Sequence, residues 1–150
     1  MRTLSCLLAL WLCSAAGAAA ASARIIKVLP HLLDRNGKHT LAPSLYERDA
    51  YQAFLRLHPE QRSGLRFDVQ WKAPVLGKFS VRLELRGRQG KESTTAVLAS
   101  DPRQGGLFSR WSALRLDGED YRKFGELTAW RATLWDGDQQ VSEQKSFLWE

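Results

Sequence analysis

The chain is predicted to fold as an all-β protein, an antiparallel β-sandwich of six to seven strands with one short inserted helix. Two segments, Leu65–Lys72 and Lys78–Arg86, alternate apolar and polar residues, which places one apolar face on each strand. Asp136-Gly137 separates two further apolar runs and is typical of a tight hairpin, because Gly readily takes a positive φ. The composition, 44% hydrophobic and 25% charged, fits one globular domain and excludes a disordered or collagen-like chain.

The first 23 residues have the pattern of a secretory signal peptide. Arg2 supplies a positive start, Leu4–Ala21 is uncharged and apolar, and a small-x-small pattern ends at Ala23. The alternative is a retained membrane anchor, but a span needs about 20 strongly apolar residues, and the second half of this stretch is mostly Ala, Ser and Gly. We expect cleavage after Ala23, a periplasmic or secreted location, no transmembrane span after cleavage, and a single domain over residues 24–150.

Cleavage at this point would remove both cysteines, Cys6 and Cys13. The remaining domain would then have no disulfide and no thiolate chemistry. Its stability must come from the core alone, and a chain of this length can bury a self-sufficient one. Loss of Arg2 lowers the formal net charge of +6 by one, so the domain is basic but not extreme.

Further strands are predicted from shorter runs that are rich in apolar and β-branched residues. They are Arg24–Leu33, Thr94–Ala99, Trp111–Leu116, Leu127–Trp135 and Gln139–Trp149. In the last of these, three apolar residues have the same parity as two charged ones, Glu143 and Lys145. We therefore expect a β-bulge or an edge position in that strand.

One helix and one helical turn interrupt the strands. Ser44-Leu45-Tyr46-Glu47 is a capping box, in which the Ser and Glu side chains each satisfy a backbone donor at a helix start. Apolar residues then recur at helical spacing until Pro59 ends the run, and they are Tyr46, Ala50, Phe54 and Leu57. Asp117–Tyr121 opens a single turn that stops at Gly125.

Three segments of the chain carry a resemblance to a known class of domain. They are the strands Leu65–Trp71 and Phe79–Leu85, and the run Leu114–Tyr121 that leads into the strand of Trp130. On these residues the sequence resembles immunoglobulin-like or fibronectin type III-like domains over roughly residues 25–149, which implies two packed antiparallel sheets. The chain lacks the inter-sheet cysteine pair of antibody domains. Ser44–Trp71 and Trp130–Trp149 also look like parts of small exported bacterial proteins without an assigned activity, which implies a location but no chemistry.

Two arrangements of the first two strong strands are open. In a direct hairpin, Trp71 would face Phe79, and Asp68 would meet Arg82 on the outer face. In an immunoglobulin-like topology the strands lie in opposite sheets, and their apolar faces meet across the core. We favour the second arrangement, because sandwiches of this length usually connect that way.

The sequence contains no motif for a known catalytic or cofactor chemistry. A nucleophile elbow, a zinc-protease helix, a Cys-x-x-Cys pair, a phosphate loop and a dinucleotide fingerprint are all missing. We therefore expect an exported, non-catalytic envelope binding or protein-interaction module with no cofactor and no bound metal. The spacing of His31, His39 and His58 gives no support for zinc. The acidic turns at Asp34–Gly37 and Asp136–Asp138 lack the ligand series of an EF-hand.

An enzymatic alternative is a carbohydrate-active hydrolase with paired carboxylates. Its acids would come from Glu119, Asp120, Asp136 and Asp138. A second alternative is a polyanion- or glycan-binding domain that uses surface Arg and Trp residues, and a third is a structural subunit of an envelope assembly. Nucleic acid is not expected as a partner of an exported protein.

The candidate binding residues are arginines and one tryptophan on polar strand faces. Trp135 has the parity of Arg131 and the opposite parity to Leu134, so it projects outward near the hairpin tip if Leu134 is in the core. Arg82 and Arg86 lie on the polar side of their strand. Such side chains suit an envelope protein or an anionic glycan as partner. The structural interpretation is that Trp135 covers one end of the sandwich or the helix that contains Tyr46, and that the cations shield a sheet face.

Overall fold

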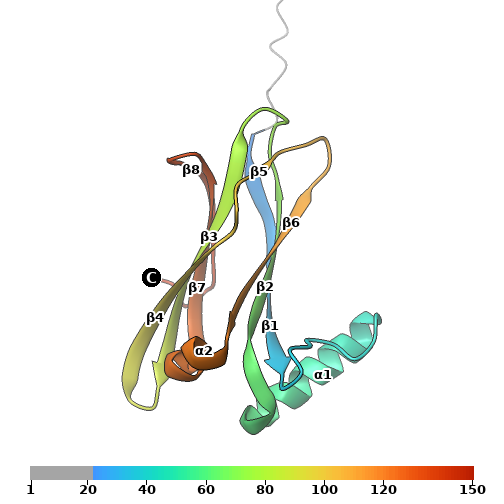
Figure 1. The fold of residues 1–150 in the computed structure, drawn as a ribbon, viewed down its shortest axis with the longest axis vertical. Helices are drawn as coiled ribbons and strands as arrows, with labels where there is room; N and C mark the ends of the chain where they lie inside the picture. The colour runs from blue at the N-terminus through green and yellow to red at the C-terminus, as the bar shows by residue number, and fades with distance from the viewer. Residues whose placement is uncertain (1–21) are drawn as a thin grey trace, which may run out of the picture.

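The computed structural model describes residues 22–150, in which two antiparallel sheets pack face to face (Figure 1). The strands are β1 (Arg24–Asp34), β2 (Arg62–Lys72), β3 (Lys78–Gln89), β4 (Glu92–Ala99), β5 (Arg103–Gln104), β6 (Arg110–Asp117), β7 (Glu126–Asp136) and β8 (Gln139–Lys145). Sheet A has the order β1-β2-β6, and sheet B has the order β4-β3-β7-β8 with β5 paired to β3. The predicted sandwich is confirmed, and the two-residue β5 is an additional eighth strand.

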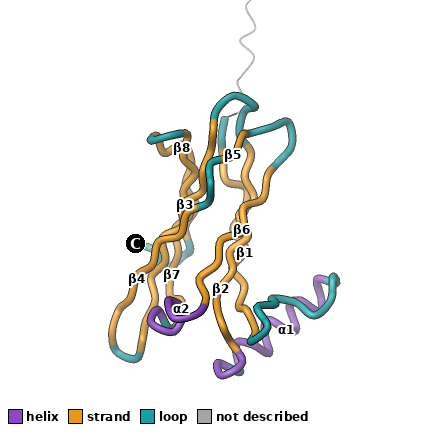
Figure 2. The backbone as a smooth tube through the Cα atoms, in the orientation of Figure 1, coloured by secondary structure: helices purple, strands orange, loops and turns teal. Residues whose placement is uncertain are grey.

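Three helical segments complete the described part of the chain, which are α1 (Leu45–Leu57), the 3-10 turn η1 (Pro59–Gln61) and α2 (Gly118–Phe124). Figure 2 shows α1 beside sheet A and α2 at one end of the sandwich, between the two layers. No helix within residues 22–150 is long and apolar enough to cross a membrane. The predicted signal peptide, apart from Ser22 and Ala23, lies outside the described residues.

The β2 and β3 strands lie in opposite sheets, so the predicted arrangement is confirmed and the direct hairpin is wrong. Their alternating apolar residues form the centre of the core, which consists of Leu65, Phe67, Val69 and Trp71 from β2 and Phe79, Val81, Leu83 and Leu85 from β3. The rings of Trp71 and Phe79 lie 6.0 Å apart between their centroids. The indole N–H of Trp71 donates to Ser112 Oγ at 2.9 Å, so its polar atom is satisfied inside the core.

The hairpin between β7 and β8 turns at Gly137, whose φ is 57°, as the Asp136-Gly137 pair predicts. The expected irregularity is a register shift at Leu134/Trp135, and β8 is an edge strand. The predicted extent of β8 to Trp149 is wrong, because the strand ends at Lys145. The next residue, Ser146, bonds to the backbone of β7, and the chain then turns at a bond from Trp149 N to Ser146 O of 3.1 Å.

Helix α1 begins after Ser44, whose hydroxyl accepts from Glu47 N at 3.5 Å. The predicted apolar face of this helix does not form its contact surface, since Tyr46 is 83% exposed and Leu57 is 79% exposed. The buried residues are instead Gln52 and Leu55. Hydrogen bonding explains why Gln52 lies on the contact surface of the helix. Its polar side chain satisfies backbone groups that an apolar side chain would leave unpaired.

The side chain of Gln52 binds the backbone of the edge strand β1. Its Oε1 accepts from Leu32 N at 2.8 Å, and its Nε2 donates to Leu32 O at 3.0 Å. The same Nε2 donates to His39 O at 2.8 Å, so the loop after β1 is held as well. One glutamine thus joins the helix, the loop and the sheet.

A second polar contact holds α1 at the end of β1. The hydroxyl of Tyr51 donates to Asp34 Oδ2 at 2.6 Å, while Asn36 N and Lys38 N donate to Asp34 Oδ1. Burial acts to raise the pKa of Asp34, but the three hydrogen bonds outweigh it and the pKa lies below its usual range. The bond to Asp34, with burial, raises the pKa of Tyr51 to about 12.

Replacement of Tyr51 by Phe is expected to lower the free energy of unfolding by about 1–2 kcal/mol at neutral pH, because one hydrogen bond to a carboxylate is lost. The folded pKa of Asp34 is depressed, so its contribution is present above about pH 4 and is lost as pH falls. The folded pKa of Tyr51 is raised, so its contribution is present below about pH 10 and is lost as pH rises. Urea denaturation of parent and variant across this range is the measurement. A difference that is constant with pH would contradict the contact.

Candidate functional site on the outer face of sheet B

The outer faces of the two sheets differ in what covers them. Part of the outer face of sheet A lies under α1, which buries Leu33 and Leu55. The outer face of sheet B has no helix over it in the described chain (Figure 1). All four residues predicted from the sequence, Arg82, Arg86, Arg131 and Trp135, lie on this uncovered face, because they alternate with the core residues of β3 and β7.

Trp135 is half-buried rather than fully exposed. The guanidinium of Arg82, on the neighbouring strand β3, lies over its ring at 4.5 Å from the centroid. Its indole N–H donates to Thr133 Oγ1 at 2.8 Å. The expected neighbour Arg131 does not contact this ring, so Arg82 is the cation that covers Trp135.

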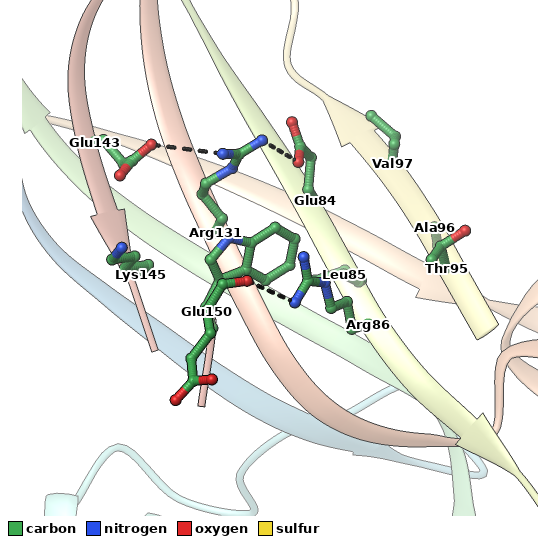
Figure 3. Close-up of a pocket in the computed structure, with 11 residues that line it drawn as sticks. Glu84, Leu85, Arg86, Thr95, Ala96, Val97, Arg131, Glu143, Lys145 and Glu150 are labelled. Atoms are coloured by element: carbon green, nitrogen blue, oxygen red, sulfur yellow. Dashed lines mark hydrogen bonds and ion pairs between the residues drawn. The ribbon is translucent and has the colours of Figure 1, made fainter. Parts of the chain in front are cut away.

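Arg131 is the centre of a second cluster, which Figure 3 shows from the outer side of the sheet. Its guanidinium donates to Glu84 Oε2 at 2.6 Å and lies 3.8 Å from Glu143 Oε2. The two carboxylates approach it from the strands on either side, β3 and β8. Both acids are therefore paired with a cation.

Trp149 lies on the same cluster and was not predicted as a site residue. The guanidinium of Arg86 lies 3.9 Å from its ring centroid, and that of Arg131 lies 5.1 Å from it. Arg86 also donates to the backbone carbonyl of Glu150 at 3.0 Å. The conflict of parity in the last predicted strand was the available signal, since Trp149 has the parity of Glu143 and Lys145, which line the same depression.

A shallow depression of about 450 Å³ lies at this cluster. Its walls come from all four main strands of sheet B and include Thr95, Val97, Arg86, Arg131 and Trp149. Val97 is 64% exposed, although it is apolar. The depression thus combines an aromatic floor, an apolar rim and several charges.

Three arginines on β3 have no acidic partner in the described chain. No Asp or Glu side chain within residues 22–150 forms an ion pair with Arg82, Arg86 or Arg88. Arg82 and Arg86 lie against indole rings, and Arg86 also donates to Glu150 O, so both guanidinium groups are held in place. The face therefore carries arginines that no acidic side chain neutralises, and two of them are held in place.

The edge strand β4 borders this face and differs from the edge strand β1. Side chains occupy the free edge of β1, since Ile25 N donates to Ser142 Oγ and Gln52 binds Leu32. In β4 the run Ser93–Ala99 carries no charge, and no side chain of the described residues donates to its backbone carbonyls. Long uncharged edges of this kind accept an additional strand.

The other residues considered from the sequence do not converge on this site. Glu119 and Asp120 lie on α2, whereas Asp136 and Asp138 lie at the far end of the eleven-residue strand β7, so the four acids do not form one pair. His58 lies near Glu60, with 3.2 Å between Nδ1 and Oε1. His31 of sheet A lies next to His39, which belongs to the loop between β1 and α1.

Comparisons of the chain with protein-family models, curated proteins and solved structures give no match. The architecture of two antiparallel sheets therefore stands on the structure alone.

Proposed function

We propose that the chain is an exported, non-catalytic, immunoglobulin-like sandwich that binds an acidic protein segment on the outer face of sheet B. The observation that carries this proposal is the set of arginines without an acidic side-chain partner, Arg82, Arg86 and Arg88, on a sheet face without cover. Two of them are held on tryptophan rings, which lowers the entropy lost when they bind an anion. Aromatic residues and arginines at the centre of a shallow depression are also the usual anchors of protein interfaces.

A protein segment fits this face better than an anionic glycan. Sugars stack on open aromatic faces, whereas arginines lie over Trp135 and Trp149, and Trp149 is only 9% exposed. The exposed Val97 offers an apolar contact that a polyanionic sugar does not use. The adjacent edge of β4 offers backbone groups that pair with an extended peptide.

The topology and the N-terminal sequence support the other parts of the proposal. One sheet contains β1, β2 and β6, and the other contains β3, β7 and β8. Immunoglobulin-like sandwiches divide these strands between their two sheets in the same way. The fourth strand, β4, pairs with β3, whereas constant-type domains place the fourth strand in the first sheet. Strand β1 begins at Arg24, so removal of a signal peptide after Ala23 would leave every strand intact.

The test is affinity capture of envelope proteins on the mature chain, with a glycan array on the same material. We expect a captured protein with an acidic segment, and we expect a synthetic peptide of that segment to bind the parent chain. The double variant Arg82→Ala, Arg86→Ala should bind the peptide at least about tenfold more weakly, because two charge-assisted contacts are lost. Trp135→Ala should weaken binding in the same direction.

The matched controls are Lys27→Ala, an exposed cation on β1, and Trp111→Ala, an exposed tryptophan on β6. Both should bind the peptide like the parent, and circular dichroism should show that all variants are folded. Equal binding by parent and double variant would refute the proposed face. Capture of a glycan instead of a peptide would favour the polyanion-binding alternative.

A further inference from the structure

Three side chains with metal-ligating atoms converge on the outer side of sheet A, away from the proposed binding face. His31 comes from β1, Asp68 from β2, and His39 from the loop between β1 and α1. One ligand atom from each lies within 4.8 Å of the other two. His31 Nε2 is 3.6 Å from Asp68 Oδ2, and the two imidazole centroids are 4.9 Å apart.

Strand pairing and hydrogen bonds fix the position of each of these residues. The strand pairing of β1 with β2 fixes His31 opposite Arg66, two residues from Asp68 on the same face. Gln52 binds the carbonyl of His39 and the backbone next to His31. Arg66 donates to both oxygens of Asp68 at 2.9–3.1 Å and thus orients its carboxylate, as outer partners of metal ligands do.

Burial and neighbouring charges lower the pKa of both imidazoles. Burial lowers the pKa of His31, and the neighbouring His39 lowers it further, while Asp68 acts in the opposite direction. Burial also lowers the pKa of His39, and Arg66 adds to the effect. Neutral imidazole keeps a free lone pair on one nitrogen. His31 Nε2 lies 3.6 Å from Asp68 Oδ2, which is too long for a hydrogen bond, so this nitrogen is not held as a donor to the carboxylate.

We infer that His31, His39 and Asp68 bind one divalent zinc ion, with water at the fourth position. Two imidazole nitrogens and one carboxylate oxygen are a usual donor set for zinc, with bonds of about 2.0–2.2 Å. Ligand atoms around one tetrahedral ion lie about 3.5 Å apart. A movement of about 1 Å in the loop of His39 therefore brings the three ligand atoms to the spacing that zinc requires. Calcium and magnesium are disfavoured, because they need more oxygen ligands than one carboxylate supplies.

The surrounding cations set a limit on the affinity. Arg48 and Arg66 act to lower the pKa of both imidazoles, and Arg115 acts to lower that of His39. Arg66 is paired with Asp68, Arg48 with Asp49 and Arg115 with Asp117, and this pairing reduces their repulsion of an added ion. The site is thus expected to bind zinc more weakly than a closed structural site.

The experiment is calorimetric titration of zinc chloride into the mature chain without an affinity tag. The parent should bind one zinc ion per chain, and its Tm should rise with zinc. His39→Ala and Asp68→Asn should each lower the zinc affinity at least about tenfold. His58→Ala is the matched control, because it removes the one histidine outside the cluster, and it should bind zinc like the parent.

Cobalt gives an independent readout that a structural role of these side chains would not produce. Co²⁺ at this site should show the visible absorption of a tetrahedral complex, and zinc should displace it. Circular dichroism should confirm that His39→Ala is folded. Zinc binding by folded His39→Ala as tight as that of the parent, loss of binding in His58→Ala, or no zinc binding by the folded parent would each overturn the inference.

Discussion

Replacement of Trp71 by Ala is expected to lower the free energy of unfolding by about 3–5 kcal/mol. Trp71 is fully buried on β2 and packs on Phe79 of the opposite sheet, so the change leaves a cavity between the two layers. It also removes the indole partner of Ser112, a buried hydroxyl on β6. Small domains have a total stability of about 5–15 kcal/mol, so the variant should be close to the limit of folding.

Equilibrium urea denaturation, followed by circular dichroism, measures this loss. Trp111→Ala is the matched control, since Trp111 is 45% exposed on the outer side of sheet A. This variant should lose no more than about 1 kcal/mol, in line with most surface substitutions. Equal losses in the two variants would contradict the position of Trp71 between the sheets.

Replacement of Gly125 by Ala should be about as damaging, for a backbone reason. Gly125 ends α2 with φ 78° and ψ −139°, a region that is almost restricted to glycine and costs other residues about 1–3 kcal/mol. A Cβ at this position would also overlap the backbone carbonyl oxygen of Arg88 on β3. We expect a total loss of more than about 3 kcal/mol, because backbone atoms of α2 or β3 must move.

Gly118→Ala, at the start of α2, separates the cost of backbone strain from the cost of a steric overlap. Gly118 has φ 61°, but nothing lies within 4 Å of a Cβ built on it. Its loss should be about 1–2 kcal/mol, the cost of a left-handed conformation alone. Urea denaturation of both variants gives the difference, which reports the contact of α2 with β3. Equal losses would show that Arg88 does not approach Gly125.

Alternation along the chain was sufficient to predict the strands β2 and β3 and the residues that they contribute to the core. The apolar residues of β2, from Leu65 to Trp71, are all buried, because a period of two decides which side chains face the other sheet. The surface of α1 was predicted less well. Its docking depends on the amide of Gln52 and on the backbone of Leu32, and a count of apolar residues does not detect such hydrogen bonds.

For the candidate site, the sequence likewise predicted which face of a strand a residue occupies but not which residues of other strands it contacts. Period two places Arg131 and Trp135 on one face, but residues four apart along a strand are about 13 Å from each other. A neighbour on the adjacent strand is much closer, and Arg82 therefore covers the ring. The cluster of His31, His39 and Asp68 depends on the pairing of β1 with β2, which the spacing of the histidines does not contain.

The two long sides of the sandwich differ in the hydrogen bonds that join one sheet to the other. Along one side, Ile25 N bonds to Ser142 Oγ at 3.0 Å, and Gln144 Nε2 bonds to Ile26 O at 3.3 Å, so β1 and β8 are joined. Between β4 and β6 no hydrogen bond forms within residues 22–150, and shallow depressions lie there instead. Thermal opening should therefore begin at the seam between β4 and β6. Amide protons of β4 should exchange first, and intermolecular sheet growth on heating should start from that strand.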